Sequence, residues 1–153
     1  MSIVQTWQTE SISLDNTLEL AAGVGQKLRG GEVIELVSDL GGGKTVFVKG
    51  LAKGMGIKDM VGSPSFTVAS QYKAGDLTLH HYDFYRLDEP GIMSNELSEI
   101  LGDPQSVVAV EWANLIDTVL PSQRLTIHIR TTDENRRKFK FVYPAHLIYL
   151  LPR

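Results

Sequence analysis

Hydrophobic and polar residues alternate in several short stretches of the chain and recur at helical spacing in others. Alternation is typical of half-buried strands, whereas apolar residues at every third or fourth position form one face of a helix. The first alternating stretch, residues 3–10, predicts a strand. Ser13 follows as a candidate N-cap for a helix over residues 14–28, which the pair Gly30-Gly31 would end.

A run of glycines separates the next strand from the next helix. Residues 32–37 are rich in β-branched side chains and predict a strand. After the glycines at 41–43, apolar residues recur at helical spacing, and Gly54 and Gly56 predict the end of that helix. The glycine run therefore forms a strand-to-helix loop.

The second half of the chain predicts further strands and one short helix. Residues 106–111, Ser-Val-Val-Ala-Val-Glu, form a short apolar run that is typical of a strand buried on both faces of a parallel sheet. The final apolar segment, 146–151, fits neither periodicity. The other expected elements are a hairpin of 66–72 with 77–84, a helix over 94–101, a helical turn over 114–119 and a strand pair of 125–131 with 138–143.

Strands separated by helices early in the chain, with hairpins inserted later, predict the α/β class. We expect a mixed, mainly parallel sheet with flanking helices, similar to the fold of P-loop nucleoside triphosphatases. The chain has 153 residues and no repeat, linker or low-complexity tract, so one domain spanning residues 1–153 is expected.

Composition narrows the classes of function. The absence of cysteine excludes a disulfide framework, a thiolate metal site and a cysteine nucleophile. No stretch approaches the roughly 18 apolar residues of a membrane span, and the first residues do not resemble a signal peptide, so we expect a cytoplasmic protein. A net charge of −3 argues against a protein that holds nucleic acid on its own. We interpret the basic cluster Arg136-Arg137-Lys138 with Lys140 as a solvated hairpin.

The candidate chemistry centres on the segment Asp39-Leu40-Gly41-Gly42-Gly43-Lys44-Thr45. It matches the phosphate-binding pattern G-x-x-x-x-G-K-[ST], except that Ser38 stands where the first glycine is expected. Backbone N–H groups of the glycines and of the helix start would face the phosphates. Lys44 would bridge the β- and γ-phosphates, and the Thr45 hydroxyl would bind Mg²⁺. We therefore expect a nucleoside triphosphate to bind with Mg²⁺ and to be hydrolysed.

Such a site requires an acidic residue at the end of a neighbouring strand. Asp83 and Glu111 each end an apolar run, and the carboxyl ends of strands are where α/β sheets bind ligands. Either carboxylate could ligate Mg²⁺ or position water. His81 lies two residues before Asp83 and would share its strand face. It would orient the magnesium shell or a substrate, or simply pack in the sheet.

The nucleotide is expected to be ATP. Guanine-specific GTPases carry an Asn-Lys-x-Asp signature, whereas this chain has Asn114-Leu115-Ile116-Asp117, without the lysine. Two other classes of protein use the same loop. A small-molecule kinase would add an arginine-rich lid, for which Arg136 and Arg137 are the only adjacent arginines. A non-catalytic nucleotide sensor or scaffold is supported by Ser38.

Several segments, in the same order, resemble the TsaE family of small bacterial ATPases required for threonylcarbamoyladenosine modification of tRNA. The run His-x-Asp-x-Tyr-Arg-Leu combined with Glu-Trp is the specific part of the resemblance. Ser38 and Ser65 depart from the family pattern, which has glycine and threonine there. The matching segments are Asp39–Thr45, Ser63-Pro-Ser-Phe-Thr67, His81-Tyr-Asp-Phe-Tyr-Arg-Leu87, Val110-Glu-Trp112 and Leu120-Pro121.

The resemblance implies an ATPase that works within an assembly. Its partners would be the threonylcarbamoyl transferase TsaD and its companion TsaB, and tRNA would be held mainly by those partners. Hydrolysis would reset the complex between rounds. The resemblance also implies nucleotide contacts outside the loop: Ser13 and Thr17 on the adenine side, Arg136 near the nucleotide, and Trp112 stacked beside it or packed in the core next to the site.

Overall fold

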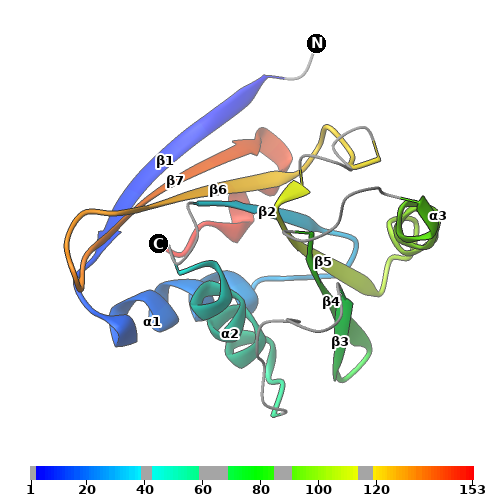
Figure 1. Cartoon of the computed structure of the whole chain (residues 1–153), viewed down its shortest axis with the longest axis horizontal. Helices are drawn as coiled ribbons and strands as arrows, with labels where there is room; N and C mark the ends of the chain where they lie inside the picture. The colour runs from blue at the N-terminus through cyan, green and yellow to red at the C-terminus, as the bar shows by residue number, and fades with distance from the viewer. Residues whose placement is uncertain (1–2, 39–42, 59–68, 85–90, 114–118) are drawn as a thin grey trace.

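A computed structural model describes residues 3–38, 43–58, 69–84, 91–113 and 119–153. Within these ranges seven strands form one sheet, with helices on both of its faces (Figure 1). None of the described helices is long and apolar enough to cross a membrane. The strands are β1 (Val4–Ser11), β2 (Val33–Val37), β3 (Ala69–Ala74), β4 (Leu77–Asp83), β5 (Ser106–Glu111), β6 (Leu125–Thr131) and β7 (Arg137–Pro144). The helices are α1 (Leu14–Gly25), α2 (Lys44–Met55), α3 (Gly91–Ile100) and the 3₁₀ helix η2 (Ala145–Leu150).

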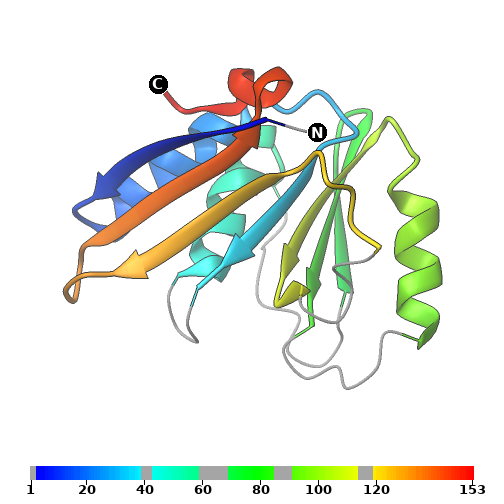
Figure 2. The same cartoon turned by 90° about the horizontal axis from the view of Figure 1, so that it is seen from above.

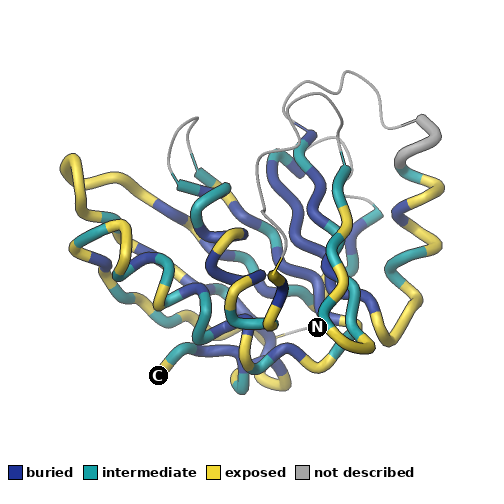
Figure 3. Tube along the Cα trace, turned by 90° about the horizontal axis from the view of Figure 1, so that it is seen from below, coloured by how far each residue is buried: buried dark blue, intermediate teal, exposed yellow. Residues whose placement is uncertain are grey.

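The strand order is β1-β7-β6-β2-β5-β4-β3. The four central strands, β6, β2, β5 and β4, pair in parallel, and the pairings at both edges are antiparallel. The expected mixed α/β sheet with inserted hairpins is therefore confirmed, with its parallel part confined to the centre. Every residue of β5 is buried, which explains its continuous apolar run; Figure 3 shows the burial of the central strands.

The two faces of the sheet carry different helices. Helices α1 and α2 lie side by side on one face (Figure 1), where Phe47 and Leu51 of α2 belong to the larger core cluster. Helix α3 lies near β4 and β5, and its Leu97 joins a second cluster. Side chains alternate along β5, so Ala109 faces the first cluster and Val110 the second.

Glycines allow α1 and α2 to touch backbone to backbone. A Cβ on Gly25 would lie 2.2 Å from the carbonyl oxygen of Leu51, and a Cβ on Gly54 would lie 2.2 Å from that of Ala22. Both distances are far below van der Waals contact, so no larger residue fits. The expectation that Gly54 helps end α2 is wrong, because Gly54 lies inside the helix; Gly56, with φ +87°, forms its C-cap.

The ends of the other elements differ modestly from expectation. Ser13 caps α1 as expected, since its side chain accepts a hydrogen bond of 3.0 Å from the Asn16 N–H, but α1 ends at Gly25 rather than near residue 28. The unplaced segment near the C-terminus forms η2, whose Leu147 and Leu150 are buried in the larger cluster. Residues 59–68 and 114–118, which include the start of the predicted strand 66–72 and most of the predicted helical turn, lie outside the described residues.

The helix contact predicts an unusual response to alanine. Replacing glycine by alanine inside a helix ordinarily favours the helix by about 1 kcal/mol. We expect Gly54→Ala to destabilise the fold by about 1–3 kcal/mol instead, because the added methyl group overpacks the interface. Urea denaturation would measure the change. Gly102→Ala is the matched control, since its nearest neighbour would be 3.9 Å away; equal stability of the two variants would contradict the close contact.

Candidate functional site

The described part of the glycine loop leads into α2 as expected. Gly43 is the N-cap of α2 with φ +99°, in the left-handed region that favours glycine. It provides no side-chain hydrogen bond to the helix start. The first N–H groups of α2 are therefore directed toward the loop, where an anion could accept from them. Asp39, Leu40, Gly41 and Gly42 lie outside the described residues, so their contacts stay predictions.

Lys44 brings the start of α2 together with the ends of two strands. Its side chain is only 5% exposed. The Nζ atom donates a hydrogen bond of 3.0 Å to the carbonyl oxygen of Ser38, just after β2. It also lies 4.2 Å from the ring centroid of Trp112, just after β5. Burying an ammonium group is costly unless polar or aromatic groups offset it, so these contacts fix the lysine at the meeting point of α2, β2 and β5.

Trp112 packs in the core next to the site, one of the two roles that the sequence left open, and stacking on a nucleotide stays a prediction. Its side chain is half-buried and packs against the cluster near α3, while its ring lies under the Lys44 ammonium. Its backbone φ is +58°, the only positive value among the described residues other than glycine. A positive φ is uncommon for a large side chain and often marks a functional site.

The two candidate acids lie next to each other. Strands β4 and β5 pair in parallel with Asp83 opposite Glu111, so their backbones are about 4.8 Å apart. Glu111 is also the register partner of Leu36 in β2, the strand that precedes the glycine loop. Glu111 is 3% exposed, whereas Asp83 is half-buried. The parallel register thus brings both carboxylates to the loop end of the sheet, as expected from the sequence.

His81 and Glu111 form a buried hydrogen-bonded pair between β4 and β5. The imidazole Nε2 contacts the carboxylate Oε2, and His81 is fully buried. Its other ring nitrogen, Nδ1, is buried and has no hydrogen-bond partner among the residues that the structure describes. A histidine so placed restricts the orientation of the carboxylate it contacts. His81 is thus packed in the sheet against Glu111, and a role toward a magnesium shell or a substrate stays a prediction.

The oxygen donors near the start of α2 would suit a cation that is bound partly by the protein and partly by phosphate oxygens. Within the described ranges no three His, Asp or Glu side chains converge. Thr45, near the start of α2, would supply a hydroxyl, and Asp83 and Glu111 would supply carboxylates. Mg²⁺ prefers oxygen ligands, keeps several waters and is usually held by one or two carboxylates plus substrate phosphates. This donor set is suited to Mg²⁺ in that arrangement.

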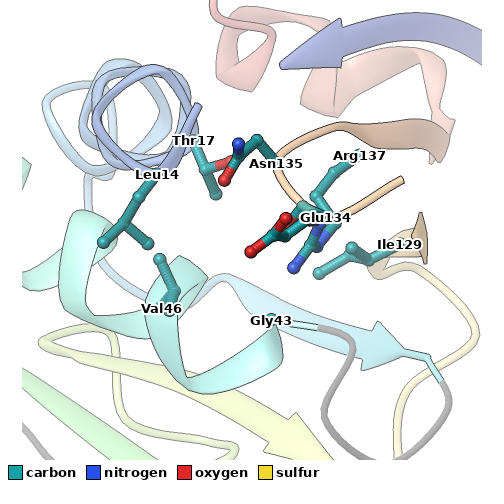
Figure 4. A pocket seen from close by; sticks show the side chains of 8 residues that line it. All are labelled: Leu14, Thr17, Gly43, Val46, Ile129, Glu134, Asn135 and Arg137. Carbon is teal, nitrogen blue, oxygen red and sulfur yellow. Dashed lines mark hydrogen bonds between the residues drawn. The ribbon is translucent and has the colours of Figure 1, made fainter. Parts of the chain in front are cut away.

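A pocket of about 300 Å³ opens beside Gly43 (Figure 4). It lies where the starts of α1 and α2 meet the hairpin of β6 and β7. Its walls combine apolar side chains with a polar edge, which is typical of sites for small planar ligands. The apolar lining residues are Leu14, Val46 and Ile129, and the others are Thr17, Gly43, Glu134, Asn135 and Arg137.

The predicted nucleotide contacts outside the loop fall in different places. Thr17 lines the pocket, and its hydroxyl pairs with that of Ser11 at 2.7 Å. Ser13 caps α1 and is not among the lining residues. Arg136 is 56% exposed, and its Nε lies 3.5 Å from a carboxylate oxygen of Asp133. Its role stays a prediction that the geometry does not favour.

The neighbouring Arg137 was predicted only as part of the solvated hairpin or of a kinase lid, and not as a nucleotide contact. It lines the pocket, and its Nε would lie 3.7 Å from a Cβ placed on Gly43. The alternation of side chains along the predicted strand could have identified Arg137 as a pocket residue. Arg137, Phe139 and Phe141 alternate along β7, and both phenylalanines face the core beneath α2. Arg137 therefore lies on the helix side of the sheet.

Comparisons with known proteins agree with the resemblance. The profile of the family described as "Threonylcarbamoyl adenosine biosynthesis protein TsaE" matches residues 11–139. A Bacillus subtilis protein named tRNA threonylcarbamoyladenosine biosynthesis protein TsaE is 38% identical over 140 residues, covering 88% of this chain and 83% of its own. A protein of that name from Aquifex aeolicus is 37% identical over 130 residues, covering 84% and 90%. The crystal structure of Bacillus subtilis YdiB superposes with a TM-score of 0.79 at 32% identity, covering 98% and 94%.

The buried pair predicts a coupling between His81 and Glu111. We expect His81→Leu to cost about 3–5 kcal/mol of stability, because it leaves the carboxylate buried without the imidazole. The double variant His81→Leu/Glu111→Leu is expected to lose less than the two single variants together, since it removes both polar groups. Urea denaturation of all three variants measures this.

His81→Gln is the conservative control for that cycle, because its amide can still donate to the carboxylate. It should lose less stability than His81→Leu. Strictly additive losses in the double variant would show that the two residues do not interact.

Proposed function

Because the chain belongs to the TsaE family, which takes part in threonylcarbamoyladenosine biosynthesis on tRNA, we propose that it binds ATP with Mg²⁺ and hydrolyses it in that pathway. The observation that carries the proposal is the position of Lys44. Its ammonium group lies where the start of α2 meets the ends of β2 and β5. Two carboxylates end neighbouring strands at the same edge of the sheet. A buried cation, a helix N-terminus and adjacent acids are the groups that phosphoryl transfer requires.

Lys44 would exchange partners when the triphosphate binds. In the structure its ammonium donates to the Ser38 carbonyl, a neutral acceptor. Phosphate oxygens are charged acceptors and form stronger hydrogen bonds with an ammonium group. The uncapped N–H groups at the start of α2 would add to the same anion site. The lysine would then stabilise charge that develops on the phosphate oxygens during hydrolysis.

We assign the two acids different roles because their surroundings differ. Glu111 is buried with one carboxylate oxygen held by His81, so its orientation is fixed and suits a residue that positions the attacking water. Asp83 is more accessible on the neighbouring strand, and together with the Thr45 hydroxyl it would hold the metal ion. Mg²⁺, when bound, neutralises charge on the β- and γ-phosphate oxygens.

The pocket beside Gly43 would hold the nucleoside. Leu14, Val46 and Ile129 provide apolar walls for the adenine ring. The amide of Asn135 offers a donor and an acceptor, the combination that pairs with the edge of adenine. The Arg137 guanidinium, next to Gly43, is suited to a phosphate group. Gly43 lines the pocket, and Lys44 follows it directly at the start of α2. One nucleotide could therefore reach both the pocket and the lysine.

Hydrolysis is expected to be slow for the isolated chain and faster with the proteins TsaB and TsaD, which we propose as its partners. We predict that Lys44→Ala abolishes productive phosphate binding. Asp83→Asn and Glu111→Gln should retain binding but lower the rate by about 10²–10³-fold, the usual effect of removing one transition-state contact. Phosphate release, measured with and without the two partners, would test these expectations.

Lys49→Ala is the matched control, because it removes an exposed lysine of the same helix and should leave the rate unchanged. Unchanged rates in both acidic variants would remove Asp83 and Glu111 from the mechanism. A wild-type chain that neither hydrolyses ATP nor responds to the partners would favour a nucleotide sensor, and transfer of phosphate to a small acceptor would favour a kinase.

The two adjacent arginines give a second prediction. Arg137→Ala should weaken ATP binding by about 10- to 100-fold, because a hydrogen bond to a charged group contributes about 1.5–3 kcal/mol and about 1.4 kcal/mol corresponds to a factor of ten. Arg136→Ala should change the affinity less than twofold, since its guanidinium is directed at Asp133. Calorimetric titration with a non-hydrolysable ATP analogue measures both. A larger loss in Arg136→Ala would restore the expectation based on family resemblance.

A further inference from the structure

The face of the sheet opposite α1 and α2 is left open by the described helices over β1, β7 and β6 (Figure 2). A shallow hollow of about 640 Å³ lies on this face. Three of its exposed side chains are cations, and one more is a histidine. The lining residues are Gln8, Thr9, Glu10, His128, Arg130, Lys138, Phe139 and Lys140. We call Arg130, Lys138, Lys140 and His128 the basic face.

The residues of the basic face are brought together by strand register. His128 lies opposite Lys140, and Arg130 lies opposite Lys138. Directly opposed side chains of an antiparallel pair have Cβ atoms about 4.5–5.5 Å apart, and like charges in such positions are destabilising. The pairing of Arg130 with Lys138 is therefore unfavourable for the isolated fold.

A nearby acid relieves this repulsion only in part. Glu10 is the register partner of Lys138 on β1, yet the described part of the chain has no carboxylate oxygen within 4.0 Å of the charged nitrogens of Arg130, Lys138 or Lys140. Three cations and one carboxylate leave the hollow with a charge of +2, with histidine neutral, in a chain whose net charge is −3. The hollow is therefore locally positive on a chain that is acidic as a whole.

The composition of this surface distinguishes between possible occupants. The centres of protein–protein interfaces are depleted of charge and enriched in aromatic side chains. The basic face has the opposite character, because its only aromatic lining residue besides the histidine, Phe139, is 1% exposed. Lys138 and Lys140 stand two residues apart on β7, roughly 6.6 Å, and Arg130 lies opposite Lys138 on β6. Such an array is suited to a chain of phosphate groups.

We propose that the basic face binds the phosphate backbone of RNA, and that tRNA is the RNA concerned, since the relatives are named for a step on tRNA. Apart from the His128 imidazole, the residues lining the hollow offer no exposed aromatic ring on which bases could stack, so binding would depend mainly on backbone phosphates rather than on sequence. Direct contact with RNA goes beyond the expectation that the partners hold most of the tRNA.

The inference does not depend on ATP binding. Side chains alternate along β7, so Arg137 lies on the face of the nucleotide pocket, whereas Lys138 and Lys140 lie on the opposite face. Variants of the basic face should therefore leave ATP affinity unchanged. Lys44→Ala should leave RNA affinity unchanged. The two proposals can consequently fail separately.

The test measures fluorescence anisotropy of a labelled, unmodified tRNA transcript with the full chain, without nucleotide, between about 50 and 200 mM salt. We expect the triple variant Arg130→Ala/Lys138→Ala/Lys140→Ala to bind at least tenfold more weakly than the wild type. The slope of log affinity against log salt should become shallower by about 0.7–0.9 for each lost phosphate contact. A second tRNA of different sequence should behave alike.

The control variant Lys49→Ala/Lys53→Ala/Lys73→Ala removes the same charge from exposed positions on α2 and β3 and should bind like the wild type. A variant that exchanges Lys138 and Lys140 for arginine keeps the charge and should also retain binding. It controls for loss of binding caused by misfolding. Equal losses in the control and the triple variant, or no tRNA binding by the wild type at the lowest salt, would overturn the proposal. Binding of acidic polyglutamate through the same residues, without tRNA binding, would instead indicate an acidic protein partner.

Discussion

The backbone contact between α1 and α2 is the constraint on which the candidate site depends. Gly25 and Gly54 allow the two helices to touch, so the N-terminal half of α1 runs beside the start of α2. The pocket beside Gly43 exists because Leu14 and Thr17 of α1 are held against the wall that α2 provides. A wider separation of the helices would open that wall. The contact between the two helices thus holds the pocket beside Gly43 close to Lys44, and under our proposal one bound nucleotide would have to span the two.

The buried charged and polar groups of the candidate site lie near the start of the same helix, α2. Lys44, His81 and Glu111 are all buried, and each is held by a contact between different elements. Charges in such surroundings interact more strongly than at the surface, and leaving one unpaired is correspondingly costly. These buried groups lie at or near the carboxyl ends of the parallel strands. This is also where an incoming phosphate and metal ion would add the strongest local charges.

The sequence predicted the features that depend on local pattern, and missed those that depend on which segments meet. The strand, glycine loop and helix around Lys44 follow from periodicity, and Asp83 and Glu111 were identified because each ends an apolar run. The contact of His81 with Glu111 joins residues thirty positions apart. It requires the parallel register of β4 and β5, which no local pattern specifies. Gly54 was misread for a similar reason, because a glycine that ends a helix and one that admits a neighbouring helix look alike in one sequence. The distinction between Arg136 and Arg137, in contrast, was accessible from alternation with the phenylalanines that follow.

The hairpin of β6 and β7 connects the two surfaces to which we assign ligands. One face of the hairpin contributes Ile129 and Arg137 to the nucleotide pocket, and the other carries the basic face. Both strands are held by ladders on either side, β7 by β1 and β6 by β2, so neither can slide without breaking several backbone hydrogen bonds. Coupling of the two surfaces by movement of the sheet would therefore require a large free energy. The turn that carries Glu134 and Asn135 is exposed and is free of that restriction. If nucleotide and RNA influence each other, the physical route is this turn, because it contacts the pocket and joins the two strands whose outward side chains form the basic face.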